Sequence, residues 1–107
     1  MSQKRIQQIE RTIDRIKEEL KQIGPMRPGS LTCQYKDRQN KTGAYWQISY
    51  TRQMKSRTEY VRGEWVDEIG RQIATHKRFK RLIDQWIDLD IERSKLTMHI
   101  AEPKATR

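Results

Sequence analysis

The chain has 107 residues, of which 34% are hydrophobic and 35% are charged, and its formal net charge is +9. A chain of this size forms one domain that can bury only a thin core. It has no apolar run near the roughly 20 residues of a membrane span, no signal-peptide core and no second cysteine, so we expect a cytoplasmic protein without membrane contact or disulfides.

Residues 1–23 are predicted to form one helix. Isoleucine or leucine recurs at alternating intervals of three and four residues, with polar residues between them, which is typical of a coiled-coil seam. Gly24 and Pro25 end the helix, because glycine suits the C-terminal cap and proline cannot continue the helix. The seam, a candidate oligomerisation surface, consists of Ile6, Ile9, Ile13, Ile16, Leu20 and Ile23.

The period changes to two within residues 24–62, after a turn that contains two of the three prolines. Apolar and polar residues alternate in three short segments that are rich in aromatic and β-branched residues, which favours strands. The connections are short enough for hairpin turns, so we expect a three-stranded antiparallel sheet. The predicted strands are residues 30–38, 44–52 and 56–62, with turns at 39–43 and 52–55.

The alternation divides the side chains of this sheet between two faces. We expect an apolar and aromatic face to cover the start of the second helix, and it consists of Leu31, Cys33, Tyr35, Trp46, Ile48, Tyr50 and Tyr60. We expect the opposite face to be polar, and it consists of Gln34, Lys36, Arg38, Gln47, Ser49, Thr51, Arg57 and Glu59. Tyr45 belongs to the polar face and is the best candidate for stacking on a base.

Residues 63–101 are predicted to form a long second helix. Val66, Ile69 and Ile73 begin an apolar stripe that continues towards the C-terminus. Because both helices carry narrow seams, we expect them to pair antiparallel, within the chain or across a homodimer. The predicted fold is therefore α+β, with a coiled-coil-like N-terminal helix, a three-stranded antiparallel sheet, a long C-terminal helix that pairs with the first, and a frayed tail at 102–107.

Positive charge is concentrated in the predicted sheet. Residues 24–62 contain eight basic and two acidic residues, whereas residues 63–107 contain nine basic and eight acidic residues. A basic segment of this kind favours a polyanionic partner, and Arg, Lys, Gln and Tyr are residue types that contact phosphates and bases. The candidate nucleic-acid-binding residues are Lys36, Arg38, Lys41, Tyr45, Gln47, Arg52, Lys55, Arg57, Arg62, Lys77, Arg78 and Arg81.

The sequence contains no evident constellation of catalytic or metal-binding residues. His76 and His99 are far apart in the chain, and a metal site needs three or four converging ligands. Cys33 alternates with polar residues in a predicted strand, which favours a buried small side chain over a nucleophile. No glycine-rich phosphate loop is present. We therefore expect a protein that is not an enzyme and that uses no metal or other cofactor.

Three segments, MRPGSLTCQY, GAYWQISYTRQMKSRTEYV and RQIATHKRFKRLIDQWIDLDIE, resemble an uncharacterised family of small prokaryotic proteins that occur beside transposases and in mobile elements. Members of that family often carry a cysteine-rich knuckle between the first two strands, where this chain reads KDRQNKTGA. The resemblance therefore implies a mobile-element context and a hairpin that holds without zinc. A weaker, architectural likeness is to AP2-type and integrase arm-binding domains, which insert a three-stranded sheet into the major groove.

These features predict a nucleic-acid-binding accessory protein, with DNA favoured over RNA, that is linked to a mobile element and dimerises through its helices. The alternative is a non-enzymatic interaction protein whose coiled-coil helices bind a partner protein such as a transposase or a nuclease. Charge reversal in the sheet would abolish the first function, and disruption of the Ile13 and Ile16 seam would abolish the second.

Overall fold

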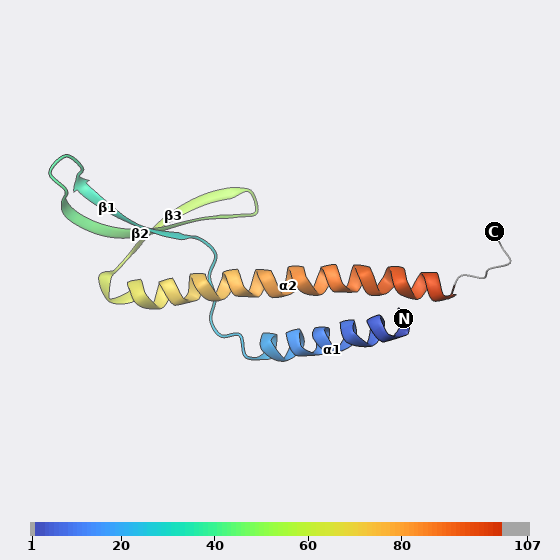
Figure 1. The fold of residues 1–107 in the computed structure, drawn as a ribbon. Helices are drawn as coiled ribbons and strands as arrows, with labels where there is room; N and C mark the ends of the chain where they lie inside the picture. Colours follow the sequence, from blue (N-terminus) through green and yellow to red (C-terminus); the bar gives the residue numbers. More distant parts are fainter. Residues whose placement is uncertain (1, 102–107) are drawn as a thin grey trace. The chain divides into compact units, whose positions relative to one another are not determined.

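The computed structural model describes residues 2–101, and the predicted tail at 102–107 lies outside the described residues. The elements follow the predicted order, which confirms the α+β class (Figure 1). The described residues divide into two compact units, and α2 contributes to both: a helical unit, residues 2–23 and 79–101, and a sheet unit, residues 24–78. The elements are α1 (Ser2–Lys21), β1 (Ser30–Asp37), β2 (Thr42–Arg52), β3 (Lys55–Val61), the 3-10 helix η1 (Gly63–Trp65) and α2 (Val66–Ala101).

The sheet has the strand order β1-β2-β3, and both pairs are antiparallel. A two-residue turn joins β2 to β3, and its residues Gln53 and Met54 have φ angles of 51° and 65°. Turns of this kind match the twist of the strands. The turn places Arg52 opposite Lys55. This register decides which side chains share a face, because residues directly opposite one another point to the same side of a sheet.

One face of the sheet packs on the first half of α2, and we call it the inner face. Ile48 of β2 is fully buried there, in a cluster with Val61 of β3 and Ile73 of α2. This packing confirms that the apolar residues of the first two strands cover the start of the second helix. The half-buried residues around the cluster are Leu31, Trp46, Val66 and Ile69.

The segment between α1 and β1 is held in the sheet unit by close backbone contacts. The backbone N–H of Arg27 donates to the carbonyl of Gln72 on α2 at 3.1 Å. Gly29 has a φ of 132°, and a Cβ added there would lie 2.8 Å from the carbonyl oxygen of Ser49 and 2.9 Å from Cγ1 of Ile48. Only glycine avoids both the strained backbone and the overlap.

The predicted alternation of β3 was wrong. Tyr60, expected on the apolar face, is 68% exposed and lies on the opposite face of the sheet. Arg57 and Glu59, expected on the polar face, lie on the inner face, where Arg57 is opposite Tyr50. The cause is the burial of Val61 in the core, because neighbouring residues of a strand point to opposite sides.

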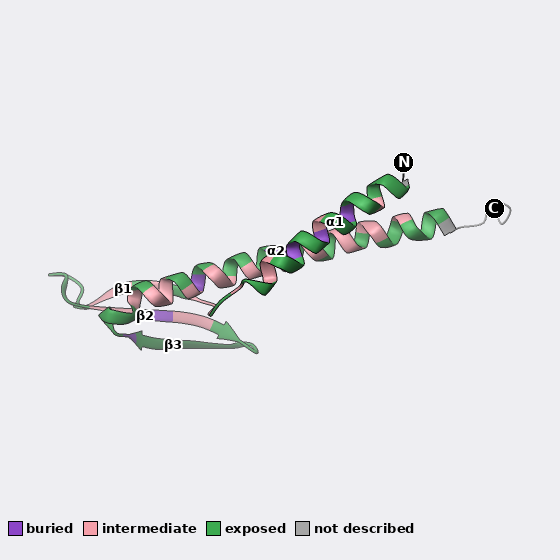
Figure 2. Cartoon of the chain, turned by 90° about the horizontal axis from the view of Figure 1, so that it is seen from below, coloured by how far each residue is buried: buried purple, intermediate pink, exposed green. Residues whose placement is uncertain are grey.

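In the helical unit, α1 lies antiparallel beside the second half of α2 (Figures 1 and 2). The guanidinium of Arg5 forms an ion pair of 2.6 Å with Glu92, and the ammonium of Lys17 lies 5.3 Å from the ring centre of Trp86. The pairing of the two helices is therefore confirmed, and it occurs within one chain. The seam of α1 is covered, with a buried centre at Ile9, Ile13 and Ile16 and half-buried residues at Ile6 and Leu20. Ile23, the last predicted seam residue, is also half-buried and follows the end of the helix at Lys21.

Candidate nucleic-acid interface

The face of the sheet that points away from α2 is called the outer face. It presents hydroxyl, amide, lysine and tyrosine side chains, and among its residues, all of which the structure describes, there is no carboxylate and no buried side chain. β3 is exposed along nearly its whole length (Figure 2). The outer face consists of Ser30, Thr32, Gln34, Lys36, Gly43, Tyr45, Gln47, Ser49, Thr51, Ser56, Thr58 and Tyr60.

Hydroxyl groups form cross-strand pairs on this face. The hydroxyl oxygens of Ser49 and Thr58 lie 3.3 Å apart, and those of Thr51 and Ser56 lie 3.2 Å apart. Each hydroxyl has one hydrogen and two lone pairs. Every pair therefore keeps hydrogen-bonding capacity for a further partner while its two side chains are held in place.

A shallow hollow of about 550 Å³ opens near the β1–β2 loop, and its lining includes Lys36, Tyr45 and Tyr60. Gly43 also lines the hollow and has a φ of 68°, and a Cβ there would lie 3.0 Å from Cβ of Lys36. Glycine thus allows the stem of the lysine to cross the strand. The hollow combines two tyrosines with one ammonium group.

Basic side chains stand at both ends of the sheet. Lys36 of the outer face and the loop residues Arg38 and Lys41 lie at the β1–β2 end. Arg52 and Lys55 flank the β2–β3 turn, where their register places them on the side of the inner face. All five are exposed. β2 has 11 residues, so the two basic ends are separated by about 35 Å.

The two acidic residues of 24–62 are occupied by contacts away from the outer face. The Asp37 carboxylate accepts the backbone N–H of Asn40 at 3.2 Å, and this bond holds the pKa of Asp37 below its ordinary value. Glu59 accepts hydrogen bonds from Arg27 and, at 2.8 Å, from the Tyr50 hydroxyl. These contacts, with Arg27 first, lower the pKa of Glu59. The Arg27 guanidinium also lies 5.1 Å from the ring centre of Tyr50.

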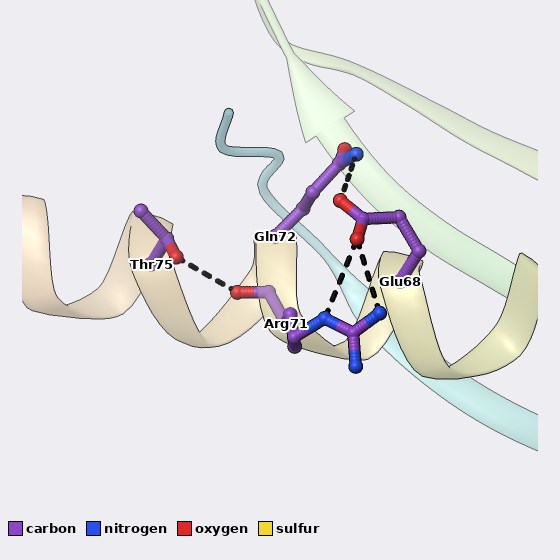
Figure 3. Close-up of polar contacts among 4 residues, drawn as sticks. All are labelled: Glu68, Arg71, Gln72 and Thr75. Carbon is purple, nitrogen blue, oxygen red and sulfur yellow. Dashed lines mark hydrogen bonds and ion pairs between the residues drawn. The ribbon is translucent and has the colours of Figure 1, made fainter. Parts of the chain in front are cut away.

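A similar network lies on the first half of α2 (Figure 3). Glu68 accepts hydrogen bonds from the amide of Gln72 at 3.0 Å and from the Arg71 guanidinium at 3.2 Å and 3.3 Å. These bonds, the one from Gln72 foremost, lower the pKa of Glu68. Thr75 donates to the Arg71 carbonyl at 2.9 Å. Arg71 is therefore engaged within its own helix.

The other predicted binding residues lie neither on the outer face nor at the two ends of the sheet. Arg57 is on the inner face, and Arg62, which follows β3, forms an ion pair of 3.4 Å with Glu64. Three further predicted residues are exposed on α2, namely Lys77 and Arg78 in the sheet unit and Arg81 in the helical unit.

The sequence analysis missed five side chains of the outer face: Ser30, Thr32, Ser56, Thr58 and Tyr60. The predicted turn at 52–55 contained the information that assigns the residues of β3 to the two faces. Once Arg52 pairs with Lys55, counting back along both strands places Tyr60 opposite Gln47. The turn therefore fixes the face of each residue in β3 more firmly than the weak alternation of the strand does.

Across residues 2–101, no group of three or more His, Cys, Asp or Glu side chains could hold a metal ion. None of the helices in the described part of the chain is long and apolar enough to cross a membrane.

Comparison with known proteins gave one match. The comparisons with curated proteins and with solved structures found nothing similar. The model of a domain of unknown function, DUF6788, matches residues 3–71, which is more than half of the chain and includes α1 and the whole sheet. The expected links to transposases and to AP2-type domains are not tested by this match and stay predictions. The chain belongs to the DUF6788 family.

Proposed function

We propose that this protein binds duplex DNA through the outer face of its sheet. The observation that carries the proposal is the composition of that face, which combines hydroxyl, amide, lysine and tyrosine side chains and has no carboxylate among its described residues, while further basic groups stand at both ends of the sheet. A surface without acidic groups approaches phosphates without like-charge repulsion.

The dimensions of the sheet suit the major groove. Neighbouring strands lie about 4.8 Å apart, so the three strands span about 10 Å between the outer backbones. The major groove of B-DNA is about 12 Å wide and admits a β-ribbon. Sheets that read DNA in this way are known in several binding motifs.

The chemistry of the face divides into two roles. The amides of Gln34 and Gln47, near the middle of β1 and β2, offer a donor and an acceptor to base edges. Arg52 and Lys55 at one end, with Lys41 at the other, supply phosphate contacts that position the sheet. The paired hydroxyls supply further phosphate or base contacts. Their side chains are already held by the cross-strand contacts, so binding does not have to order them.

The salt dependence of binding tests the proposal. Fluorescence anisotropy with a short random-sequence duplex, between about 50 and 200 mM salt, should give a log–log slope of about −4 to −5 if the five basic side chains at the two ends each neutralise one phosphate. A slope near zero overturns the proposal.

Charge reversal at the β2–β3 turn tests whether this end of the sheet contacts the DNA. The double substitution Arg52→Glu and Lys55→Glu should weaken binding at least tenfold and remove about two units of slope. The matched control reverses two exposed charges on α1, Lys4→Glu and Arg11→Glu, and should retain most of the affinity. Equal losses in both variants would show that only the net charge matters. The alternative function is binding of a protein partner through the helices. That binding should not change in the variant with Arg52→Glu and Lys55→Glu.

A second candidate is binding of single-stranded nucleic acid, which the hollow between Tyr45 and Tyr60 favours. Stacking of a base on an aromatic ring contributes about 1–3 kcal/mol, so Tyr60→Ala should weaken single-strand binding by roughly tenfold or more. Trp65, 55% exposed in η1, provides the matched control Trp65→Ala. If Tyr60→Ala leaves single-strand binding unchanged, this candidate is excluded.

A further inference from the structure

The second half of α2 carries an apolar stripe that is separate from the seam with α1. Ile87 is 50%, Ile91 49% and Met98 63% exposed, although all three are large apolar side chains. They recur with Ile83 at intervals of four, four and seven residues, so they follow one side of the helix. We call Ile83, Ile87, Ile91 and Met98 the second stripe.

The second stripe is continuous with the established packing of the helical unit. It lines a shallow apolar groove whose border includes Trp86 and Arg93. Both border residues also face α1, because Lys17 lies over the Trp86 ring and Arg93 forms an ion pair of 3.6 Å with Glu10. The groove therefore extends the two-helix interface onto an open side. Four large side chains are buried among the described residues of this unit, namely Ile9, Ile13, Ile16 and Leu82.

We infer that the second stripe is the interface of a homodimer in which two copies of α2 pack antiparallel about a two-fold axis near Ile91. A two-fold interface uses the same patch on both chains. Pairing two helical hairpins in this way would close a four-helix arrangement and cover the exposed isoleucines, which is the usual route to stability for thin helical units.

The charges beside the second stripe favour a second copy of α2, in antiparallel orientation, as the partner that covers it. Asp88 and Lys95 lie on the same flank of the second stripe, three residues before and four residues after Ile91. Along the helix axis these offsets are about 4.5 Å and 6 Å in opposite directions. In an antiparallel pair, Asp88 of each chain therefore meets Lys95 of the other. A parallel pair would bring Asp88 towards Asp90 of the second copy, which is unfavourable.

The mass of the full chain in solution tests the interface directly. We expect a dimer by sedimentation equilibrium, and Ile91→Asp should convert it to a monomer without loss of helix by circular dichroism, because Ile91 is half exposed in the single chain. Met54→Asp, at a turn residue that is 97% exposed, is the matched control and should remain dimeric. A monomeric unmodified chain, or a dimer that survives Ile91→Asp, overturns the inference.

A charge exchange tests the orientation. Asp88→Lys and Lys95→Asp should each raise the dimer dissociation constant, because each places like charges opposite one another. The double variant restores both pairs and should recover the affinity of the unmodified chain. Additive losses in the double variant would overturn the antiparallel arrangement.

Cross-linking gives an independent measure of the same orientation. In a Cys33→Ala background, Ile91→Cys lies near the proposed two-fold axis and should form an intermolecular disulfide on mild oxidation. Ile83→Cys lies about 12 Å from the axis on each chain, which is beyond the reach of a disulfide, and should remain a monomer on a non-reducing gel. Equal cross-linking at both positions indicates a parallel pair and contradicts the inference.

None of these three tests of the dimer measures DNA binding. The dimer can therefore be confirmed or refuted separately from the proposed function.

Discussion

The inner and outer faces of the sheet are built from alternate residues of the same three strands, yet their chemistry differs. The inner face holds the buried core around Ile48 together with the Arg27, Tyr50 and Glu59 cluster. The outer face has hydroxyl, amide, lysine and tyrosine groups at every position that the structure describes apart from glycine. The inner face therefore provides the buried core of the sheet unit. The outer face buries no side chain, so its polar groups can contact a ligand.

The largest expected effect is loss of the core at its centre. Ile48→Ala removes a fully buried side chain and should lower the free energy of unfolding by about 3–4 kcal/mol, with Ile48→Val costing about 1 kcal/mol. The neighbouring outer-face variant Gln47→Ala should cost less than about 1 kcal/mol. Urea denaturation followed by circular dichroism measures all three. Similar losses of unfolding free energy in Ile48→Ala and Gln47→Ala would contradict the view that only the inner face stabilises the sheet unit.

The backbone next to the inner face should be the next most sensitive feature. Gly29→Ala introduces a Cβ at a φ of 132° and within 2.8 Å of the Ser49 carbonyl, so it should destabilise the protein by about 2 kcal/mol. Gly24→Ala is the matched control, because no atom would lie within 4 Å of its added Cβ. A neutral result for Gly29→Ala in urea denaturation would contradict the close packing of this segment.

Acid should weaken the inner-face ion pair. The pKa of Glu59 lies below its ordinary value of 4.5, first because of Arg27 and then because of Tyr50. The unfolded chain therefore binds the proton more readily, so this stabilisation is present above about pH 4.5 and is lost as the pH falls below it. Glu59→Gln should reduce the fall in urea midpoint between about pH 6 and pH 3, and Tyr50→Phe should reduce it less. An unchanged fall in Glu59→Gln would show that the pair is not stabilising.

The smallest effect on stability should come from the hydroxyls of the outer face. Thr58→Val keeps the shape of an exposed side chain and removes its contact with Ser49, so the free energy of unfolding should change by no more than about 0.5 kcal/mol. If the outer face binds DNA, the same variant should weaken binding several-fold at constant stability. Unchanged affinity in the anisotropy assay would exclude the hydroxyl of Thr58 from the interface.

Much of the fold was predictable because it depends on local periodicity. The three-and-four spacing from Ile6 to Ile23 identified α1, and the proline and glycine residues after it identified the turn. The alternation in β1 and β2 was strong enough to assign their faces, including Tyr45 on the outer side. The alternation in β3 was weak, because Tyr60 and Val61 are adjacent and either could be the buried residue.

The sequence by itself determined the element types, their order and the concentration of positive charge in the sheet, since these follow from spacing and composition. The alternation of β3 did not show which of its sides faces the core, because the face of a strand residue depends on the pairing register set by the turn at 52–55 and on what α2 can bury. The tertiary structure supplied both. It also decided that the seam of α1 closes within the chain, since a heptad pattern specifies an apolar stripe but does not identify its partner. The open second stripe on α2 became evident only once that partner was known.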